Sequence, residues 1–125
     1  MKTVLVIEDN EQNLYLTRFM LEQQGYRVMT ASEGAEAIAM FHKHRDKVKL
    51  VLTDIMMPVM GGVNLIRSLH AIEPKLKVLA ASGLTDQANQ IELASVGVHS
   101  VLGKPCSPRQ VLEAIRDQLA PAAGP

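Results

Sequence analysis

The feature that most constrains the fold is a regular alternation between short apolar runs and longer amphipathic stretches. Short runs rich in β-branched residues, typical of strands, occupy residues 3–8, 26–31, 50–53, 77–82 and 100–103. Each is followed by a stretch with helical spacing of apolar residues: 11–25, 33–44, 62–73, 86–97 and 107–120. Because parallel strands need helical crossovers, this order predicts an α/β domain with five parallel strands and helices on both faces.

The expected strand order determines where a functional site would lie. We expect a flavodoxin-like (βα)5 fold with a five-stranded sheet of order 2-1-3-4-5. In that order the first and third strands are neighbours, and ligands bind beside the carboxyl ends of the strands at this switch point. Polar residues that follow the first and third strands are therefore the candidates for function.

Local signals place the helix ends. Gly25 is expected to stop the first helix, whose apolar residues are predicted to lie on or near one face: Leu14, Leu16, Phe19, Met20 and Leu21. Ser32 and Thr85 are expected to cap the second and fourth helices. The last helix is expected to have Ser107 as its N-cap, Pro108 as its first residue and Gln110 completing a capping box.

Composition narrows the class of protein. With 125 residues and 47% hydrophobic content, the chain suits one domain with a real core, expected over residues 1–120 before a disordered tail or linker at 121–125. Acidic and basic residues cancel, which disfavours nucleic acid or an anionic membrane as a partner. A single cysteine, Cys106, and no apolar run of about 20 residues favour a cytoplasmic location.

Polar residues occur where the predicted strands end. Glu8 and Asp9 follow the first strand, Asp54 the third, Ser82 the fourth and Lys104 the fifth. Three crowded carboxylates repel one another unless a divalent cation and an ammonium group compensate. Hard oxygen ligands with room for water suit Mg²⁺, which in proteins is commonly shared with phosphate.

These residues fall within a pattern that resembles the response-regulator receiver domain of two-component signalling. Its parts are "ED" at Glu8-Asp9, "DIMMPVMGG" at residues 54–62, "SG" at Ser82-Gly83 and "KP" at Lys104-Pro105. The resemblance implies that Asp54 takes a phosphoryl group from a histidine kinase or a histidine phosphotransfer domain. It also implies a switched surface for a downstream protein target, in a monomer or a weak phosphorylation-dependent dimer.

By matching positions, the resemblance assigns roles at the site. Glu8, Asp9 and Asp54 would hold Mg²⁺ with the backbone carbonyl of Met56. Ser82 would bind a phosphoryl oxygen and Lys104 would pair with the acyl phosphate. The chain would not be an enzyme acting on outside substrates, because its chemistry would be limited to its own phosphorylation and dephosphorylation.

Two other classes of function stay open at the level of the sequence. A phosphohydrolase of the haloacid dehalogenase type also uses an aspartyl nucleophile and Mg²⁺, but it needs an Asp where this chain has Met56. A protein-binding module that works without phosphorylation is the other alternative, against which the acidic cluster argues. The sequence also leaves open a single-domain regulator and the receiver of a hybrid sensor kinase.

Overall fold

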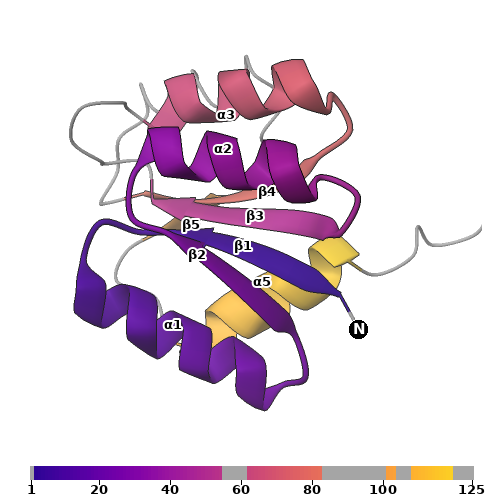
Figure 1. The fold of residues 1–125 in the computed structure, drawn as a ribbon. Helices are drawn as coiled ribbons and strands as arrows, with labels where there is room; N and C mark the ends of the chain where they lie inside the picture. Colours follow the sequence, from indigo (N-terminus) through magenta and orange to yellow (C-terminus); the bar gives the residue numbers. More distant parts are fainter. Residues whose placement is uncertain (1, 55–61, 83–100, 104–107, 120–125) are drawn as a thin grey trace, which may run out of the picture.

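The computed structural model describes residues 2–54, 62–82, 101–103 and 108–119 (Figure 1). Its strands form one parallel sheet with the order β2-β1-β3-β4-β5. The strands are β1 (Thr3–Ile7), β2 (Arg27–Ala31), β3 (Val48–Asp54), β4 (Lys77–Ser82) and β5 (Val101–Gly103). The order β2-β1-β3-β4 confirms the flavodoxin-like prediction, and the short β5 pairs with β4 where a fifth strand is expected.

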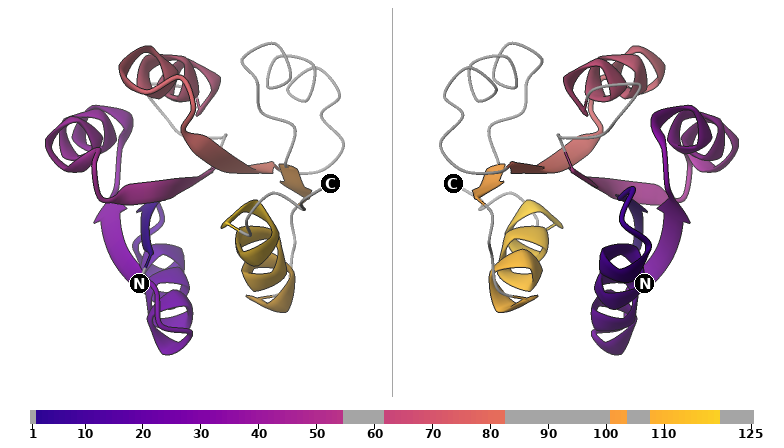
Figure 2. Two further views of the ribbon diagram at one scale, coloured as in Figure 1. Left: turned by 90° about the vertical axis from the view of Figure 1, so that its right-hand side faces the viewer. Right: turned by 90° about the vertical axis from the view of Figure 1, so that its left-hand side faces the viewer.

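Helices cover both faces of the sheet, as predicted (Figures 1 and 2). The helices α2 (Gly34–His44) and α3 (Gly62–Ile72) lie on one face. The helices α1 (Glu11–Gln23) and α5 (Pro108–Leu119) lie on the other. The expected helix at 86–97 with its Thr85 cap, the Ser107 cap and the tail at 121–125 lie outside the described residues.

Two apolar layers hold the helices to the sheet. One layer packs Phe41, Ile66 and Leu69 of α2 and α3 against the strands. The other packs Leu21 of α1 and Ile115 of α5 against the opposite face. Every residue of β1 is buried, which is expected for a central strand covered on both sides. The continuous apolar runs of the sequence thus belong to strands between two helical layers.

The predicted apolar face of α1 is partly wrong. Leu16 and Phe19 are 62% and 56% exposed, whereas Leu14 and Leu21 pack against the sheet with α5. Successive helical residues are about 100° apart, so Leu14 and Leu21 share a stripe while Leu16 lies about 200° from Leu14. The prediction had counted apolar residues along the helix without requiring them to share one stripe.

The expected Ser32 cap is also wrong. The N-cap of α2 is Glu33, in an extended conformation and without a capping side-chain hydrogen bond. Ser32 stands one residue too early, and its Oγ donates to Oε2 of Glu36 at 3.2 Å. A serine before a helical stretch indicates that a helix begins nearby, but it does not determine which residue is the N-cap.

The ends of α1 and α5 follow the sequence more closely. Gly25 has a φ of 91°, and the backbone N–H groups of Gly25 and Tyr26 donate to the carbonyls of Glu22 and Leu21. This pair of bonds is a Schellman motif, which confirms Gly25 as the stop of α1. Pro108 is the first residue of α5, as expected. In the part of the chain that is described, no helix is both long and apolar enough to cross a membrane.

Candidate functional site

The sheet brings the predicted strand-end residues to one edge. Asp54 is the last residue of β3, and Ser82 is the last residue of β4. Glu8 follows β1 directly, and Ile7 at the end of β1 is paired with Thr53 beside Asp54. Asp54 is in turn paired with Ala81 of β4. The carboxyl ends of β1, β3 and β4 are therefore adjacent, with Asp54 on the middle strand.

Two predicted site residues cannot be placed in this geometry. Met56 and Lys104 lie outside the described residues. Lys104 follows Gly103, the last residue of β5, which is paired with Ser82 of β4. For Asp54 and Ser82 the description covers the backbone. The roles of Asp54 and Ser82 therefore stay predictions, and the strand register supports only the positions of their backbones at this edge of the sheet.

Glu8 is the candidate ligand whose surroundings are best defined. It is 9% exposed, and its backbone N–H donates to the carbonyl of Ala31 at 3.1 Å, which continues the pairing of β1 with β2. Its Oε1 accepts a hydrogen bond from Nδ2 of Asn13 at 3.2 Å. A buried carboxylate needs such partners, because an unpaired buried charge is costly. Asn13 thus orients one of the predicted metal ligands.

The start of α1 fixes Asn13 in turn. Asn10 is the N-cap, and its Oδ1 accepts a hydrogen bond from the backbone N–H of Asn13 at 3.0 Å. The backbone of Asn13 is held by the cap, while its side chain turns toward Glu8. The segment from Glu8 to Asn13 is therefore a small bonded unit that carries Asp9, which is exposed, between a buried carboxylate and a helix start.

These donors suit a hard cation. Carboxylate oxygens, one buried and one exposed, are what a magnesium ion that keeps several waters requires. Other carboxylates at the same edge follow β1 and β2: Glu11, Glu33 and Glu36. Within the described ranges, no three His, Cys, Asp or Glu side chains form a group that could hold a metal. The fit therefore depends on adding Asp54 to Glu8 and Asp9.

The sequence reasoning did not single out Asn10 or Asn13. The signal was present, because Asn10 is a favoured N-cap residue and Asn13 stands at the third helical position, where a polar side chain can reach back past the cap. Attention to the carboxylates alone left these supporting amides out of the predicted site.

Comparisons with known proteins agree on one family. A family profile described as the response regulator receiver domain matches residues 4–116. The chemotaxis protein CheY of Thermotoga maritima is 31% identical over 116 residues, which cover 91% of this chain and 94% of CheY. A crystal structure of a response regulator receiver domain protein from Clostridium thermocellum superposes with a TM-score of 0.90 at 29% identity, covering 95% of this chain and 94% of that one.

Some relatives are much longer than this chain. The alkaline phosphatase synthesis transcriptional regulatory protein PhoP of Bacillus subtilis is 29% identical over 110 residues. That match covers 88% of this chain but 45% of PhoP, so the chain spans about half the length of this relative.

Proposed function

The chain belongs to the response regulator receiver family, whose members are phosphoaccepting signalling domains of two-component systems, and we propose that Asp54 is its phosphoacceptor. The observation that carries the proposal is the position of Asp54. It ends β3 between the carboxyl ends of β1, which leads into Glu8 and Asp9, and β4, which ends at Ser82. A carboxylate at this switch point has acidic neighbours on one side and a hydroxyl residue on the other.

The proposed reaction is a phosphoryl transfer from a phosphohistidine. A carboxylate oxygen of Asp54 bonds to phosphorus while the P–N bond breaks, and the electron pair stays on the imidazole nitrogen, which takes up a proton. The Lys104 ammonium would pair with the incoming phosphoryl oxygens, and the Ser82 hydroxyl would donate to one of them. Both residues would stabilise charge that Asp54 alone would repel.

Receiver domains generally bind Mg²⁺, and the donor set at this edge fits that ion. In the proposal, Glu8, Asp9, Asp54 and the backbone carbonyl of Met56 would hold it. Bound Mg²⁺ would neutralise negative charge on the carboxylates and the phosphoryl group. The Asn13 amide would keep the Glu8 carboxylate in its binding orientation.

Further parts of the proposal concern the whole chain. Receiver domains interact with histidine kinases and downstream targets, and we assign this chain a kinase or histidine phosphotransfer domain as donor and a protein as target. The domain would span residues 1–120 with a complete (βα)5 architecture, and residues 121–125 would be a disordered tail or a linker. We further propose a cytoplasmic monomer or weak phosphorylation-dependent dimer, whose only chemistry is its own phosphorylation and dephosphorylation.

Intact mass spectrometry after incubation with acetyl phosphate and Mg²⁺ tests the proposal. The wild type should gain one phosphoryl group, and chelation of Mg²⁺ should prevent the gain. Asp54→Asn should not be labelled, whereas Asp46→Asn, an exposed aspartate between α2 and β3, should be labelled normally. Undiminished labelling of the Asp54→Asn variant would show that the acceptor lies elsewhere.

A further inference from the structure

The net charge of zero conceals a separation of charge across the sheet. At the edge where the strands begin, opposite Asp54, lie many exposed cations. We call this set the basic edge: Lys2, Arg27, Lys43, Arg45, Lys47, Lys49, Lys75, Lys77 and Arg116. The described carboxylates that accompany it are fewer: Glu22, Asp46, Glu73 and Asp117. The edge as a whole is therefore positive.

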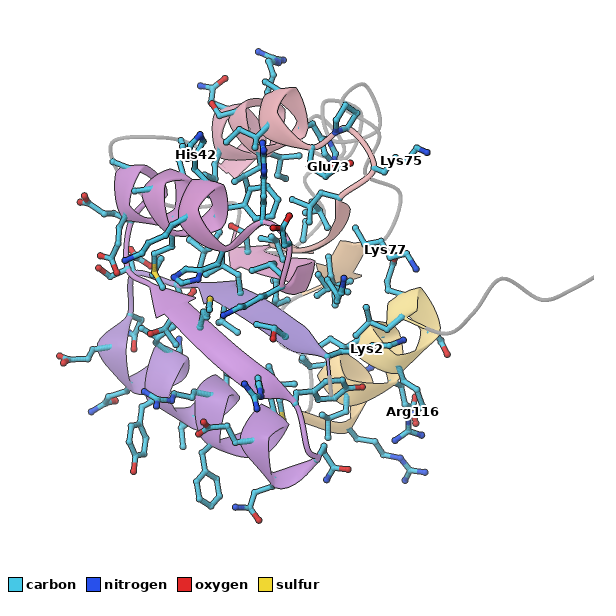
Figure 3. The ribbon with its side chains drawn as sticks, turned by 45° about the vertical axis from the view of Figure 1, so that its right-hand side comes forward. Lys2, His42, Glu73, Lys75, Lys77 and Arg116 are labelled. Carbon is cyan, nitrogen blue, oxygen red and sulfur yellow. The ribbon has the colours of Figure 1, made fainter. Side chains whose placement is uncertain are left out.

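The strand register makes neighbours of residues that are distant in sequence. Thr3, which follows Lys2, is paired with Arg27 on one side and with Val48 on the other. Leu50, next to Lys49, is paired with Lys77. Since adjacent strands are about 4.8 Å apart, cations recur at close intervals across the sheet. Figure 3 shows Lys75, Lys77, Lys2 and Arg116 following one another along one side of the molecule, from α3 to α5.

Among the described residues, no ion pair involves a cation of the basic edge. The ion pairs found there, Arg18 with Glu22 and Arg109 with Glu113, lie within α1 and α5 and involve none of the basic edge. Lys2 and Lys77 donate to backbone carbonyls at the end of α5, whose partial negative charge offsets only part of the charge of the two ammonium groups. The basic edge therefore presents a positive potential to an anionic partner.

The chemistry of the edge distinguishes between kinds of anionic partner. Protein interfaces usually have an apolar core, and peripheral membrane attachment usually needs apolar anchors. The large exposed hydrophobic residues of the described chain are Tyr15, Leu16 and Phe19 of α1, which do not belong to the basic edge. Binding to a nucleic-acid backbone, in contrast, is mainly electrostatic.

The lack of an exposed aromatic side chain among the described residues at the basic edge favours duplex over single-stranded nucleic acid as the partner. Binding to single strands generally uses exposed aromatic side chains on which bases stack. The aromatic residue nearest in sequence to the basic edge, Tyr26, is half-buried against the core between the sheet and the α1–α5 pair. We propose that the basic edge binds the phosphate backbone of duplex nucleic acid without sequence preference. This proposal departs from the expectation drawn from net charge alone, which nothing in the structure tests.

Fluorescence anisotropy with a labelled mixed-sequence duplex tests this proposal on the unphosphorylated chain, independently of Asp54. Affinity should fall steeply between about 50 mM and about 200 mM KCl, with a log–log slope near −4 if about four cations contact phosphates. Lys47→Gln/Lys75→Gln should bind more weakly, with a slope that is smaller in magnitude by about 2. This double variant keeps Lys2 and Lys77, so the hydrogen bonds from these two lysines to the end of α5 are retained.

The matched control is Arg18→Gln/Arg109→Gln, which removes the same charge from exposed residues outside the basic edge. It should retain the wild-type affinity and slope. Equal weakening of both double variants would overturn the proposal, because net charge rather than the edge would then govern binding. So would the absence of salt-dependent duplex binding at the lowest salt, or tighter binding to single strands, polyglutamate or phosphatidylserine vesicles than to the duplex under the same conditions.

Discussion

Asn13 shows how a single side chain outside the acidic pattern can determine the properties of a candidate metal site. Its amide donates to Glu8 at 3.2 Å, and Glu8 is too buried to be oriented by bulk water. Groups that orient metal ligands typically affect affinity by roughly 10-fold to 100-fold when they are removed. A change at Asn13 therefore tests the proposed Mg²⁺ site without changing a ligand.

We expect Asn13→Ala to weaken Mg²⁺ binding by about tenfold, because the Glu8 carboxylate loses a donor that helps to orient it. The backbone N–H of Asn13 remains on Asn10, so the cap of α1 should be kept, and any fall in melting temperature should reflect the lost hydrogen bond to Glu8. Mg²⁺ titration followed by amide chemical shifts measures the affinity. Gln12→Ala, at the adjacent exposed position of α1, is the matched control and should bind as the wild type does. Equal affinities in the two variants would remove Asn13 from the site.

The helix α1 begins beside the candidate site, and different interactions determine where it begins and where it ends. Asn10 holds the first turn through a side-chain cap, while Gly25 lets the backbone reverse after the last turn. Each device can be removed separately.

Replacing Asn10 with Ala should lower the free energy of unfolding by about 1 kcal/mol, because the backbone N–H of Asn13 loses its acceptor. Asn10→Asp keeps an acceptor oxygen and should keep most of the stability. Urea unfolding measures both. A full loss in the Asp variant as well would mean that the cap does not act through this hydrogen bond.

Gly25→Ala should also destabilise the fold by about 1 kcal/mol, for a reason that lies in the backbone alone. No atom lies within 4 Å of where a Cβ would stand, so crowding is not the cause, but a φ of 91° is unfavourable for an L side chain. Gly25→Asn should lose less, since Asn tolerates left-handed conformations better than Ala. Equal stability of the Ala variant and the wild type in urea would contradict the argument.

The same elements show what the sequence could and could not predict. The buried strands, the Gly25 stop and the Pro108 start follow from local signals with direct structural consequences, namely buried apolar runs, a left-handed position and a missing N–H group. The strand order instead comes from the flavodoxin-like fold that the alternation of strands and helices suggests. The exposure of Leu16 and Phe19 depends on which stripe of α1 packs against the sheet. Whether Ser32 or Glu33 is the N-cap of α2 depends on where the chain leaves β2. Glu8 and Asp9 were predicted at the site from the sequence. The hydrogen bond from Asn13 to Glu8 could not be predicted, because it depends on how the first turn of α1 is oriented relative to the end of β1.

Across the whole molecule, Lys2 before β1 and Lys77 at the start of β4 are both bonded to the end of α5. Lys2 Nζ donates to the carbonyl of Leu119 at 2.5 Å, and Lys77 Nζ donates to the carbonyl of Gln118 at 2.7 Å. Carbonyls at a helix end lack intrahelical partners and carry partial negative charge, so cations there are favourable. The end of α5 is thus bonded to β1 and β4 as well as packed through Ile115 and Leu119.

We expect Lys2→Met and Lys77→Met each to lower the free energy of unfolding by roughly 0.5–1 kcal/mol, because methionine keeps the apolar stem but not the ammonium donor. The double variant should lose less than the sum, since fraying of the last turn after one change already weakens the other bond. Hydrogen exchange at the last amides of α5 should accelerate in all three variants. Lys49→Met is the matched control, because Lys49 Nζ donates to the carbonyl of Asp46, in the segment before β3, at 3.4 Å and does not bond to α5. This variant should leave hydrogen exchange in α5 unchanged. Strictly additive losses with unaltered exchange in α5 would show that the two lysines act separately on the sheet and do not hold the last helix.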